Sequence, residues 1–599
     1  MNIVDTKHKE ALEFIEEVTR NTDKVQKQVL SEILSISSHV EYLLRYGLNG
    51  RTDVETYKNV IPIASYEHLK PYIERIANGD NSPILCGRPI TDFLLSSGTS
   101  GGERKIFPCT EEEMERIWFA RSLVMPVVNR YVTGMDKGKA LFFMFSKENA
   151  YTPGGLPFCS ALTVFYRSWQ FKNRPYDPFE DYTSPDETIL CEDFDQSTYS
   201  QCLCGLYQSR LVVRVGSVFV YGIVRIILFI QKHWSLLCDD IRTGTVNAQI
   251  IRDVSVREAV EKILVKPDPE LADFIEFECK RDESWKGIIG RLWPNAKYID
   301  AIITGSMSQH IPSVDFYSNG LPFVSARYAC SECFLGINLN PLCKPNEVAY
   351  TLIPTMAYFE FLPIQLDDEQ EQQYDDDAQQ LVDLADVKLG YEYELYVTTY
   401  TGLYRYGVGD VLRVVGFKNT APQFRYICRK KILLSIDCEK TNELELQNAV
   451  QNAMTHLMKK FNVSLVDYTS YADTTSTRNQ GHYVFYWELR HDDRNFINAT
   501  TANGGTIPKS VFEECCLVSE ESLNSEYKEN RTLDKSIGPL EIKIVEAGTF
   551  DKLMDYAISR GSSASQYKTP RCVKDVHLLN SCVVSNYFSQ ECPNYSPGL

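Results

Sequence analysis

A segment rich in serine and glycine, Leu95–Lys105, carries the residues whose types and spacing best suit chemistry. Its sequence, LSSGTSGGERK, has four hydroxyl groups and three glycines after an apolar run. The hydroxyl groups belong to Ser96, Ser97, Thr99 and Ser100. Because glycines leave backbone N–H groups open to a ligand and hydroxyls add donors, we expect a phosphate loop here. A flexible turn is the alternative, and the adjacent cations Arg104 and Lys105 favour the phosphate.

Neither of the common nucleotide-binding patterns occurs in this segment. The Walker pattern, GxxxxGK followed by Ser or Thr, is absent, and so is the dinucleotide pattern GxGxxG. The mode of phosphate binding must therefore differ from both.

A second segment, Tyr328-Ala-Cys-Ser-Glu-Cys333, ends another apolar run. Magnesium prefers carboxylates such as that of Glu332, and Tyr328 offers a flat face to a base. Cys330 and Cys333 form a CxxC pair, which zinc or redox chemistry can use. No second Cys/His pair stands at ligand spacing, which favours buried structural thiols.

A third segment, Leu403–Val411, places Asp410 after a glycine and just before the apolar run Val411–Val415. A carboxylate near a strand end can accept both hydroxyls of a ribose. Taken alone, an ordinary turn aspartate is the simpler interpretation of Asp410.

The elements that must position these segments alternate between helix and strand. Apolar residues at helical spacing between Ala11 and Leu48 predict an opening pair of helices, which Gly47 to Gly50 ends. The alternation that follows is typical of an α/β architecture with buried strands. The predicted strands of this part are Phe93–Leu95, Ala140–Phe145, Leu211–Val220, Ile299–Thr304 and Phe323–Tyr328.

The second half of the chain begins with an acidic segment, Asp367–Gln380, which predicts an exposed, mobile loop. We expect a domain boundary near Lys430–Thr441, after which strands and helices mix. The predicted strands are Tyr391–Tyr400, Asp410–Gly416, Ile432–Ile436, His482–Leu489 and Leu540–Val545. The predicted helices are Glu443–Phe461, Ser510–Leu523 and Phe550–Arg560.

Size and charge exclude several classes of protein. A chain of 599 residues is too long for one small domain, and 44% hydrophobic with 24% charged residues is ordinary for a globular protein. The net charge of −18 argues against nucleic acid or an anionic membrane as partner. An anionic ligand must therefore be captured locally.

The compartment follows from the cysteines and the N-terminus. The 18 cysteines are scattered without regular spacing, which favours a reducing compartment. The first residues contain acids and no apolar core of a signal peptide, so we expect a cytoplasmic protein. Val212–Ile230, the most apolar stretch, is interrupted by Arg214 and Arg225 and predicts a buried strand and helix rather than a membrane span.

Together, the three segments and the smaller domain after them resemble the plant Gretchen Hagen acyl-acid amido synthetases of the adenylate-forming superfamily, and most closely the clade that conjugates indole-3-acetic acid. The resemblance runs from about Leu12 to the C-terminus. Further shared strings are Leu48–Arg51, Asn173–Asp177, Asp240–Gly244, Ile303–Met307, Met356–Phe361, Tyr468–Ala472, Lys535–Glu541 and Gln566–Arg571.

This resemblance implies an α/β fold of the adenylate-forming type with two domains. Residues 1–430 would form a large N-terminal α/β domain whose sheets are flanked by helices, and residues 437–599 a small, mobile C-terminal α+β domain. The implied reaction uses ATP and magnesium. A small acyl acid, such as the auxin indole-3-acetic acid, forms acyl-AMP and pyrophosphate, and an amino acid then takes the acyl group in an amide.

The resemblance also assigns roles to individual residues. Tyr328 would flank adenine, Asp410 would bind ribose, Glu332 would hold magnesium, and Lys568 would meet the leaving pyrophosphate. The residues assigned to the phosphates and the acyl adenylate are Ser96, Ser97, Thr99, Ser100, Thr304 and Gly305. Those assigned to the substrate pockets are Arg116, Tyr151, Cys159, Leu162, Tyr221 and Arg327.

Several of these positions depart from the auxin clade. Arg327 replaces a methionine, and Gly407 replaces an arginine. Tyr151 stands for a lysine, Cys159 for an arginine, and Tyr221 adds bulk where the clade has serine. Such changes fit a different acyl acid or amino acid, or a catalytically weakened paralogue that only binds nucleotide or acid. An acyl-CoA ligase and a non-catalytic sensor are the alternatives from other classes.

Overall fold

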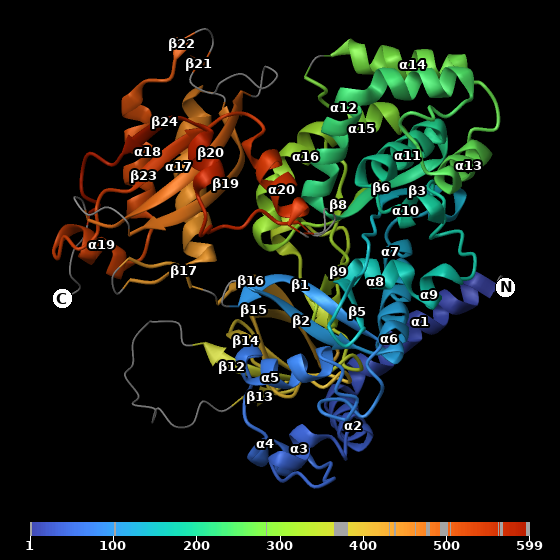
Figure 1. Ribbon diagram of the computed structural model, residues 1–599, viewed down its shortest axis with the longest axis vertical. Helices are drawn as coiled ribbons and strands as arrows, with labels where there is room; N and C mark the ends of the chain where they lie inside the picture. The colour runs from blue at the N-terminus through green and yellow to red at the C-terminus, as the bar shows by residue number, and fades with distance from the viewer. Residues whose placement is uncertain are drawn as a thin grey trace. The chain divides into compact units, whose positions relative to one another are not determined.

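The computed structural model describes residues 3–100, 103–282, 284–364, 381–430, 432–436, 439–461, 463–474, 480–491, 501–502, 505–560, 562 and 567–594. They form two compact units (Figure 1). Unit 1 comprises Met1–Arg281 and Lys286–Ile427, and unit 2 comprises Asp282–Trp285 and Cys428–Leu599. The acidic segment Asp367–Gln380, predicted as a loop, lies outside the described residues.

The predicted opening pair of helices is confirmed as α1 (Ile3–Arg20) and α2 (Thr22–Ile36), followed by the short α3 (Glu41–Arg45). On α2, Val29, Leu30, Ile33 and Leu34 are buried, which is the helical spacing that the sequence displays. The next helices are α4 (Val54–Val60) and α5 (Tyr66–Ala77).

A four-stranded sheet of unit 1 has the order β2-β1-β5-β4. Its strands are β1 (Asp92–Ser100), β2 (Glu103–Cys109), β4 (Ala150–Tyr151) and β5 (Pro157–Ser160). Strand β5 runs parallel to β1, with Cys159 beside Leu94 and Ser160 beside Leu95. The helices that follow these strands are α6 (Glu111–Ser122), α7 (Val124–Asn129), α8 (Ala161–Arg167) and α9 (Trp169–Lys172).

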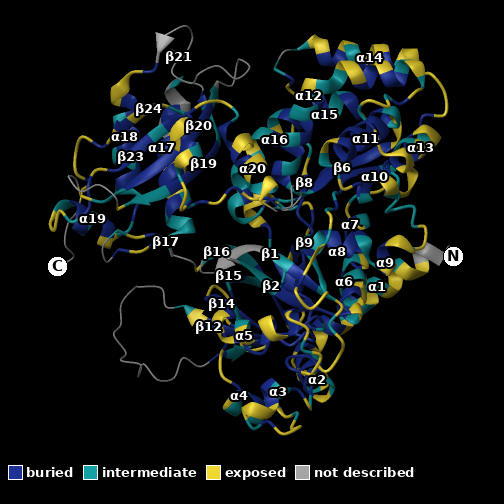
Figure 2. Ribbon diagram, viewed as in Figure 1, coloured by how far each residue is buried: buried dark blue, intermediate teal, exposed yellow. Residues whose placement is uncertain are grey.

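A parallel sheet of unit 1 has the order β3-β6-β7-β8. Its strands are β3 (Lys139–Phe143), β6 (Val212–Phe219), β7 (Ile299–Ile302) and β8 (Phe323–Val324). The strands are buried, and Figure 2 shows them dark blue among the surrounding helices, as parallel strands require. Those helices are α10 (Asp186–Leu190), α11 (Phe194–Tyr207), α12 (Val220–Thr243), α13 (Val254–Ile263), α14 (Pro269–Arg281), α15 (Ile288–Leu292) and α16 (Ile311–Ser318).

The apolar stretch Val212–Ile230 forms strand β6 and the first half of α12, as predicted. Within the described part of the chain, one helix, α12, is long and apolar enough to cross a membrane. It packs against α11, α14 and β6, and core helices meet the same criterion.

The largest sheet of unit 1 has eight strands in the order β13-β12-β14-β15-β16-β11-β10-β9. The pairs β9–β10, β10–β11, β11–β16, β12–β13, β12–β14 and β14–β15 are antiparallel. Its strands are β9 (Arg327–Ala329), β10 (Phe334–Ile337), β11 (Tyr350–Leu352), β12 (Tyr358–Ile364), β13 (Val382–Asp383), β14 (Glu392–Thr398), β15 (Tyr406–Lys418) and β16 (Ala421–Arg429).

The predicted single strand Phe323–Tyr328 is wrong, because the chain changes sheets within it. Phe323–Val324 is β8 of the parallel sheet, whereas Arg327–Ala329 is β9 of the large sheet. The Ser325 hydroxyl between them lies 2.8 Å from the Tyr350 hydroxyl. This polar contact and the antiparallel pairing of β9 with β10 favour a change of sheet, although the apolar run suggested one continuous strand.

Unit 2 is built on a sheet of order β19-β20-β23-β24, which confirms the predicted mixture of strands and helices. Its strands are β19 (Val463–Asp473), β20 (His482–His491), β23 (Glu541–Val545) and β24 (Val583–Phe588). The helices are α17 (Glu443–Phe461), α18 (Lys509–Glu521), α19 (Ser525–Thr532), α20 (Thr549–Ser559) and α21 (His577–Ser581). Two small ladders complete it: β17 (Ile432–Leu434) with β18 (Thr441–Asn442), and β21 (Thr501–Ala502) with β22 (Gly505–Thr506). Trp487, Phe485 and Phe512 lie in its core.

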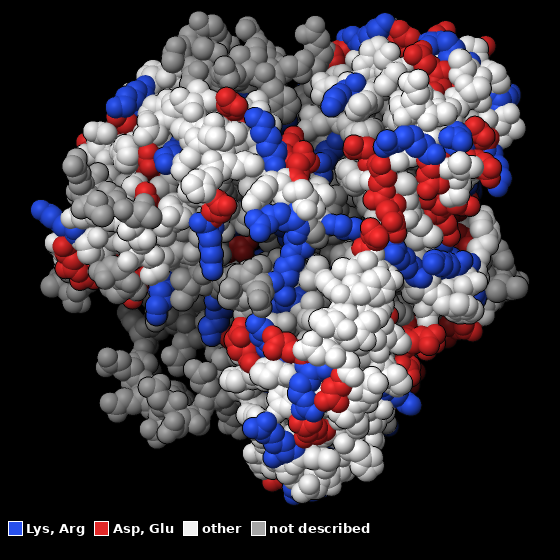
Figure 3. Space-filling view, in the orientation of Figure 1, with Lys and Arg blue, Asp and Glu red and all other residues white. Residues whose placement is uncertain are grey.

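The predicted α/β architecture with sheets flanked by helices is therefore confirmed. Figure 3 shows acidic and basic side chains interspersed on the face drawn, despite the net charge of −18.

Candidate functional site

Tyr328 and Asp410, which the sequence places 82 residues apart, meet inside unit 1. The Tyr328 hydroxyl donates a hydrogen bond of 2.7 Å to Oδ2 of Asp410, and both residues are buried. Asp410 lies within β15, not in the turn that the sequence also allowed. Gly409 has a φ of +83°, and the pairing of β14 with β15 is irregular between Val411 and Gly407, which marks a β-bulge. The bulge sets the direction of the Asp410 side chain.

Two further aromatic rings lie against the Tyr328 ring. Tyr350 stacks on it with ring centroids 5.4 Å apart, and Tyr426 meets it edge-on at 6.4 Å. The Tyr350 hydroxyl lies 3.4 Å from the Thr304 hydroxyl. This wall of aromatic rings suits a flat base.

The backbone of Gly305 lies close to the Tyr426 ring of this wall. Its φ is +63°, and a Cβ added there would lie 3.0 Å from the Tyr426 ring. Only glycine fits this conformation and spacing without strain. Thr304, Gly305, Tyr328 and Asp410, four of the predicted nucleotide residues, are therefore linked through Tyr350 and Tyr426.

The electrostatics of the pair favour a neutral tyrosine and an acceptor carboxylate. Burial raises the pKa of Tyr328 well above its usual value, and the Asp410 charge raises it further. The hydroxyl therefore keeps its proton and donates a hydrogen bond to the Asp410 carboxylate. A carboxylate has about four acceptor sites and can therefore accept several hydrogen bonds at once.

Glu332 lies in the turn between β9 and β10 and is buried. Burial, followed by the nearby carboxylate of Glu332, raises the pKa of Cys330 well above its usual value. The Cys330 thiol donates to the Cys333 carbonyl at 3.5 Å, and that of Cys333 donates to the Phe334 carbonyl at 3.1 Å. Both cysteines are free thiols, in keeping with a structural role.

No group of three or more His, Cys, Asp or Glu side chains within the described ranges is arranged to hold a metal. Magnesium usually takes only one or two protein carboxylates and completes its shell with phosphate oxygens and water. A single buried carboxylate such as Glu332 fits that chemistry.

The predicted loop in the Ser/Gly segment is wrong for Ser96 to Ser100, which form the end of strand β1. The backbone of Ser96 to Ser100 continues β1, and Thr99 and Ser100 pair with Arg104 and Glu103 of β2. The pairing is irregular between Leu95 and Thr99, so backbone groups of Ser96 to Gly98 leave the regular ladder. Ser96 is buried. The side chains of Ser97, Thr99 and Ser100 lie outside the described part, and their role stays a prediction.

The predicted substrate residues fall into separate environments. Arg116 on α6 lies over the Tyr400 ring, 3.4 Å from its centroid, and 3.9 Å from Glu32. Tyr151 on β4 is 66% exposed. The buried Cys159 thiol donates to the Glu148 carbonyl at 3.6 Å.

Leu162 and Tyr221 lie deeper. Leu162 on α8 packs against an aromatic cluster that contains Phe142, Phe165 and Tyr166. Tyr221 on α12 packs against His310, with ring centroids 4.6 Å apart, at the end of the 3₁₀ helix Gly305–His310. Tyr221 is thereby connected to the segment that begins at Gly305.

Arg327 points away from the wall of aromatic rings around Tyr328. Strand side chains alternate between faces, and Arg327 lies on the opposite face of β9 from its neighbour Tyr328. Its guanidinium donates to Asp300 at 3.3 Å and lies 5.8 Å from the Phe142 ring centroid. Phe142 of the Leu162 cluster is thus its aromatic neighbour.

Gly407, where the auxin clade has an arginine, faces an aromatic ring. A Cβ at this position would lie 3.1 Å from the Tyr396 ring, so a larger side chain needs that ring to shift slightly.

Lys568 belongs to unit 2 and is exposed, just before a segment that is anchored to the core of that unit. The Thr569 hydroxyl and the Arg571 guanidinium both donate to the buried carboxylate of Asp467, at 2.5 and 2.7 Å. The anchored backbone gives Lys568 a defined place on the surface of unit 2.

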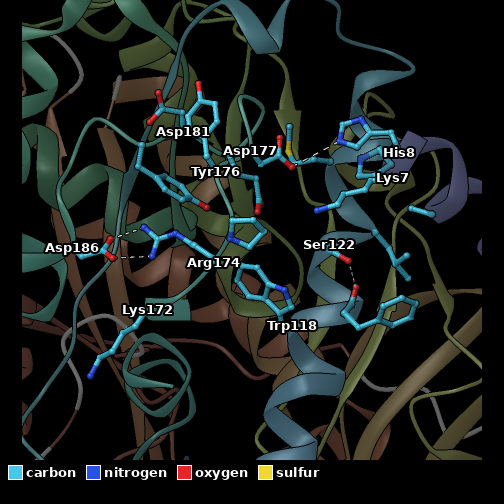
Figure 4. Close-up of a pocket in the computed structure, with 18 of the residues that line it drawn as sticks. Lys7, His8, Trp118, Ser122, Lys172, Arg174, Tyr176, Asp177, Asp181 and Asp186 are labelled. Carbon is cyan, nitrogen blue, oxygen red and sulfur yellow. Dashed lines mark hydrogen bonds and ion pairs between the residues drawn. The ribbon is translucent and has the colours of Figure 1, made fainter. Parts of the chain in front are cut away.

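A cavity of about 820 Å³ lies elsewhere in unit 1, between α1, α6, α7 and residues 172–186. Figure 4 shows Arg174 directed at Asp186, to which it donates at 2.9 Å, and His8 directed at Asp177. Trp118 and Tyr182 line this cavity and also pack against the Phe142 cluster. None of the predicted site residues lines it.

Sequence reasoning missed Tyr350, Tyr426 and Asp300. These residues carry no motif, and each stands in an ordinary strand. Only the spatial order of the strands reveals that they adjoin Tyr328, Gly305 and Arg327.

Comparison with known proteins now places the chain. Family models described as the GH3 family N-terminal, central and C-terminal domains match residues 11–323, 350–429 and 444–577. Indole-3-acetic acid-amido synthetase GH3.6 of Arabidopsis thaliana is 60% identical, covering 99% of this chain and 96% of the relative. Probable indole-3-acetic acid-amido synthetase GH3.1 of Oryza sativa subsp. japonica is 55% identical, with 99% and 94% covered.

A solved structure extends the similarity to three dimensions. The AtGH3.15 acyl acid amido synthetase in complex with 2,4-DB superposes with a TM-score of 0.88 at 43% identity, covering 98% of each chain. Sequence, domain order and fold agree along the whole chain, which therefore belongs to the GH3 family.

Proposed function

We propose that this chain is an ATP-dependent acyl-acid amido synthetase, a ligase that joins a carboxylic acid to an amino acid and releases AMP and pyrophosphate. The observation that carries the proposal is the linked group of Thr304, Gly305, Tyr328 and Asp410, which supports a nucleotide site. The names of the relatives, which this chain matches over nearly their full length, support an acid and an amino acid as substrates.

In the first half-reaction, a carboxylate oxygen of the acid attacks the α-phosphorus of ATP, forming acyl-AMP and releasing pyrophosphate. A free carboxylate is a poor acyl donor because oxide is a very poor leaving group, whereas AMP leaves readily. Catalysis then consists mainly of positioning and of charge neutralisation.

The residues of unit 1 would position the nucleotide. Asp410 would accept hydrogen bonds from the ribose hydroxyls, since a carboxylate can accept several hydrogen bonds at once. The rings of Tyr328 and its neighbours would lie against adenine. The donors for the phosphates would be Ser96, Ser97, Thr99, Ser100 and the backbone of the irregular part of β1, with Thr304 and Gly305 near the acyl adenylate.

Glu332 and Lys568 would bring positive charge to the phosphates, the first through bound magnesium and the second directly. Glu332 would hold magnesium, which supplies positive charge to the phosphate oxygens when it is bound. Lys568 would stabilise the negative charge that grows on pyrophosphate as it leaves, a role that needs unit 2 to be mobile.

In the second half-reaction, the free amine of an amino acid attacks the acyl carbon, the bond from that carbon to the AMP oxygen breaks, and the amide is released. The acid that we propose is indole-3-acetic acid or a related auxin, which the names of the relatives support. Arg116, Tyr151, Cys159, Leu162, Tyr221 and Arg327 would line the substrate pockets. The 17 cysteines described are free thiols, which suits a cytosolic enzyme.

A second candidate, the same reaction on a different acid, is favoured by one observation. Arg327 puts a guanidinium beside the aromatic cluster that contains Leu162. A fixed charge in an acyl pocket changes which acid leaves a buried group unpaired.

An assay of AMP release against a panel of acyl acids and amino acids tests the proposal. We expect AMP only when ATP, an acid and an amino acid are all present, and an amide of matching mass. AMP that depends on coenzyme A would instead identify a thioester-forming ligase. Saturable ATP binding with no AMP from any pair would identify a non-catalytic binding protein.

A further inference from the structure

Arg327 on β9 belongs to a buried cluster of charges that includes side chains from β6 and β7 of the parallel sheet in unit 1. Asp300 on β7 accepts a hydrogen bond from Arg327 at 3.3 Å and lies 3.5 Å from Nη1 of Arg214 on β6. Asp300 and Arg214 are almost fully buried, and the Arg327 side chain is 14% exposed. One carboxylate therefore serves two guanidinium groups.

The surroundings of this cluster leave positive charge in surplus. Glu180 is a second carboxylate whose charge acts on both arginines. Arg121 on α6 is a third guanidinium, 4.6 Å from the Phe165 ring centroid, and it forms no ion pair among the residues that the structure describes. Three cations thus stand against two carboxylates. Buried charge without a partner is costly, so an anion entering here would relieve that cost.

The cluster also contains buried hydrogen-bond donors that have no acceptor among the described residues. The Nε–H of Arg327 is buried and, among the described residues, has no acceptor. The Tyr166 hydroxyl, also buried, has no partner there either. Burial raises the pKa of Tyr166 to about 12, so its hydroxyl remains a possible donor at neutral pH.

The walls of this region are aromatic. Phe142, Phe165 and Tyr166 form its buried part, with Leu162 and Trp118 packed against them. The Trp118 and Phe165 rings stack with centroids 6.1 Å apart, and Arg327 lies 5.8 Å from Phe142. We call these five residues with Arg327 the aromatic pocket. Its composition suits a ring that carries an acceptor group.

Resting on the function proposed above, we infer that the preferred acyl acid carries a second anionic group, which Arg327 binds in the aromatic pocket. The second group is a carboxylate, or an anion of similar shape, on the ring or its far end. Arg327 projects from β9 away from Tyr328, so it does not face the wall of aromatic rings around Tyr328. The reacting carboxylate must meet the α-phosphate on the nucleotide side, which leaves the guanidinium for the other end of the acid.

Matched acids test this inference. Each isomer of carboxyphenylacetic acid is compared with the nitrophenylacetic acid of the same substitution, because a nitro group has the planar shape of a carboxylate without its charge. We expect kcat/KM for the carboxy acid to exceed that for the nitro acid in at least one isomer. Arg327→Met should abolish this preference by lowering kcat/KM for the carboxy acid about 10- to 100-fold, the range of a charged hydrogen bond. The nitro acid should change little.

Arg291→Met is the control. Arg291 on α15 is also a part-buried arginine, lies 3.6 Å from the carboxylate of Glu278, and has a buried Nε without a partner among the described residues. It does not belong to the aromatic pocket and should leave the preference unchanged. Arg327→Lys keeps the charge and should retain part of the preference. This variant serves as the test if Arg327→Met fails to fold.

Three results would overturn the inference: a wild-type protein that prefers the nitro acids throughout, an Arg327→Met effect of equal size on both acids, or the same effect from Arg291→Met. Calorimetric binding of the same acids separates this from a failure of the proposed function. If no acid yields AMP, the proposed function fails, and the measured Kd values for carboxy and nitro acids still decide whether Arg327 selects an anion.

Discussion

Tyr328 and Asp410 form a 2.7 Å hydrogen bond although their strands, β9 and β15, are separated by β10, β11 and β16 in the large sheet. Four steps between strands span about 19 Å in a flat sheet, at about 4.8 Å per step. A tyrosine side chain cannot cover that distance, so the sheet must curl toward itself. The curl brings Tyr350 and Tyr426 around the same ring and makes a concave wall from residues far apart in the chain.

Removal of the Asp410 carboxylate tests the nucleotide site. We expect Asp410→Ala to weaken ATP binding about 10- to 100-fold, because each charged hydrogen bond contributes about 1.5–3 kcal/mol. Asp410→Asn should weaken it less, since the amide still accepts one bond. Isothermal calorimetry measures both. An unchanged ATP affinity in a folded Asp410→Ala protein would show that the ribose does not bind there.

A magnesium titration tests Glu332. Glu332→Gln keeps the size of the side chain and removes its negative charge, so the magnesium concentration for half-maximal adenylation should rise, on the order of tenfold. The KM for ATP at saturating magnesium should change much less. A titration curve that coincides with the wild-type curve would limit Glu332 to a structural part in the turn.

Lys568→Ala separates binding from chemistry. If Lys568 stabilises the leaving pyrophosphate, acyl-adenylate formation should slow roughly 100- to 1,000-fold while ATP binding to unit 1 is kept. Lys574→Ala, an exposed lysine in the same unit, is the matched control. The role would be refuted by equal rates for the two variants in a single-turnover assay of pyrophosphate release.

Because Glu113 is buried, we expect the free energy of unfolding of this protein to depend on pH. This carboxyl on α6 is buried, its Oε2 has no hydrogen-bond partner among the described residues, and burial raises its pKa to about 8 despite nearby Arg116. Below pH 4.5 the folded and unfolded states both hold the proton. As the pH rises toward 8, only the unfolded state releases it, so stability falls by roughly 3–5 kcal/mol in total.

Glu113→Gln removes this titration. The variant should gain stability relative to the wild type between pH 5 and pH 9, measured by chemical denaturation at each pH. Glu111→Gln, at an exposed position on the same helix, should run parallel to the wild type. A constant difference between Glu113→Gln and the wild type across this range would contradict a raised pKa.

Local patterns predicted much of the fold, because the apolar periodicity that buries a helix or strand is written in consecutive residues. The division of Val212–Ile230 into β6 and α12 followed from such a pattern. The change of sheet between Val324 and Arg327 could not, since both halves are apolar and the choice depends on β7 and β10, the strands that each half pairs with.

The candidate site was predictable only in part for the same reason. Asp410 and Tyr328 stand in short motifs visible in the sequence, but their roles came only from the resemblance of the three segments to one family. Tyr350, Tyr426 and Asp300 gain their roles from the curl of one sheet and the register of another, which no local pattern contains. Arg327 was expected in a substrate pocket, and its partner Asp300 was not foreseen.

The central claim, transfer of an acid through its adenylate, is tested most directly with an acid whose carboxylate is labelled with ¹⁸O. Attack of that carboxylate on the α-phosphorus carries one labelled oxygen into the phosphate, and attack of the amine on the acyl carbon then leaves it in AMP. The account predicts AMP heavier by one ¹⁸O in amounts equal to the amide, read by mass spectrometry. Amide formed with unlabelled AMP, or with ADP in place of AMP, would contradict it.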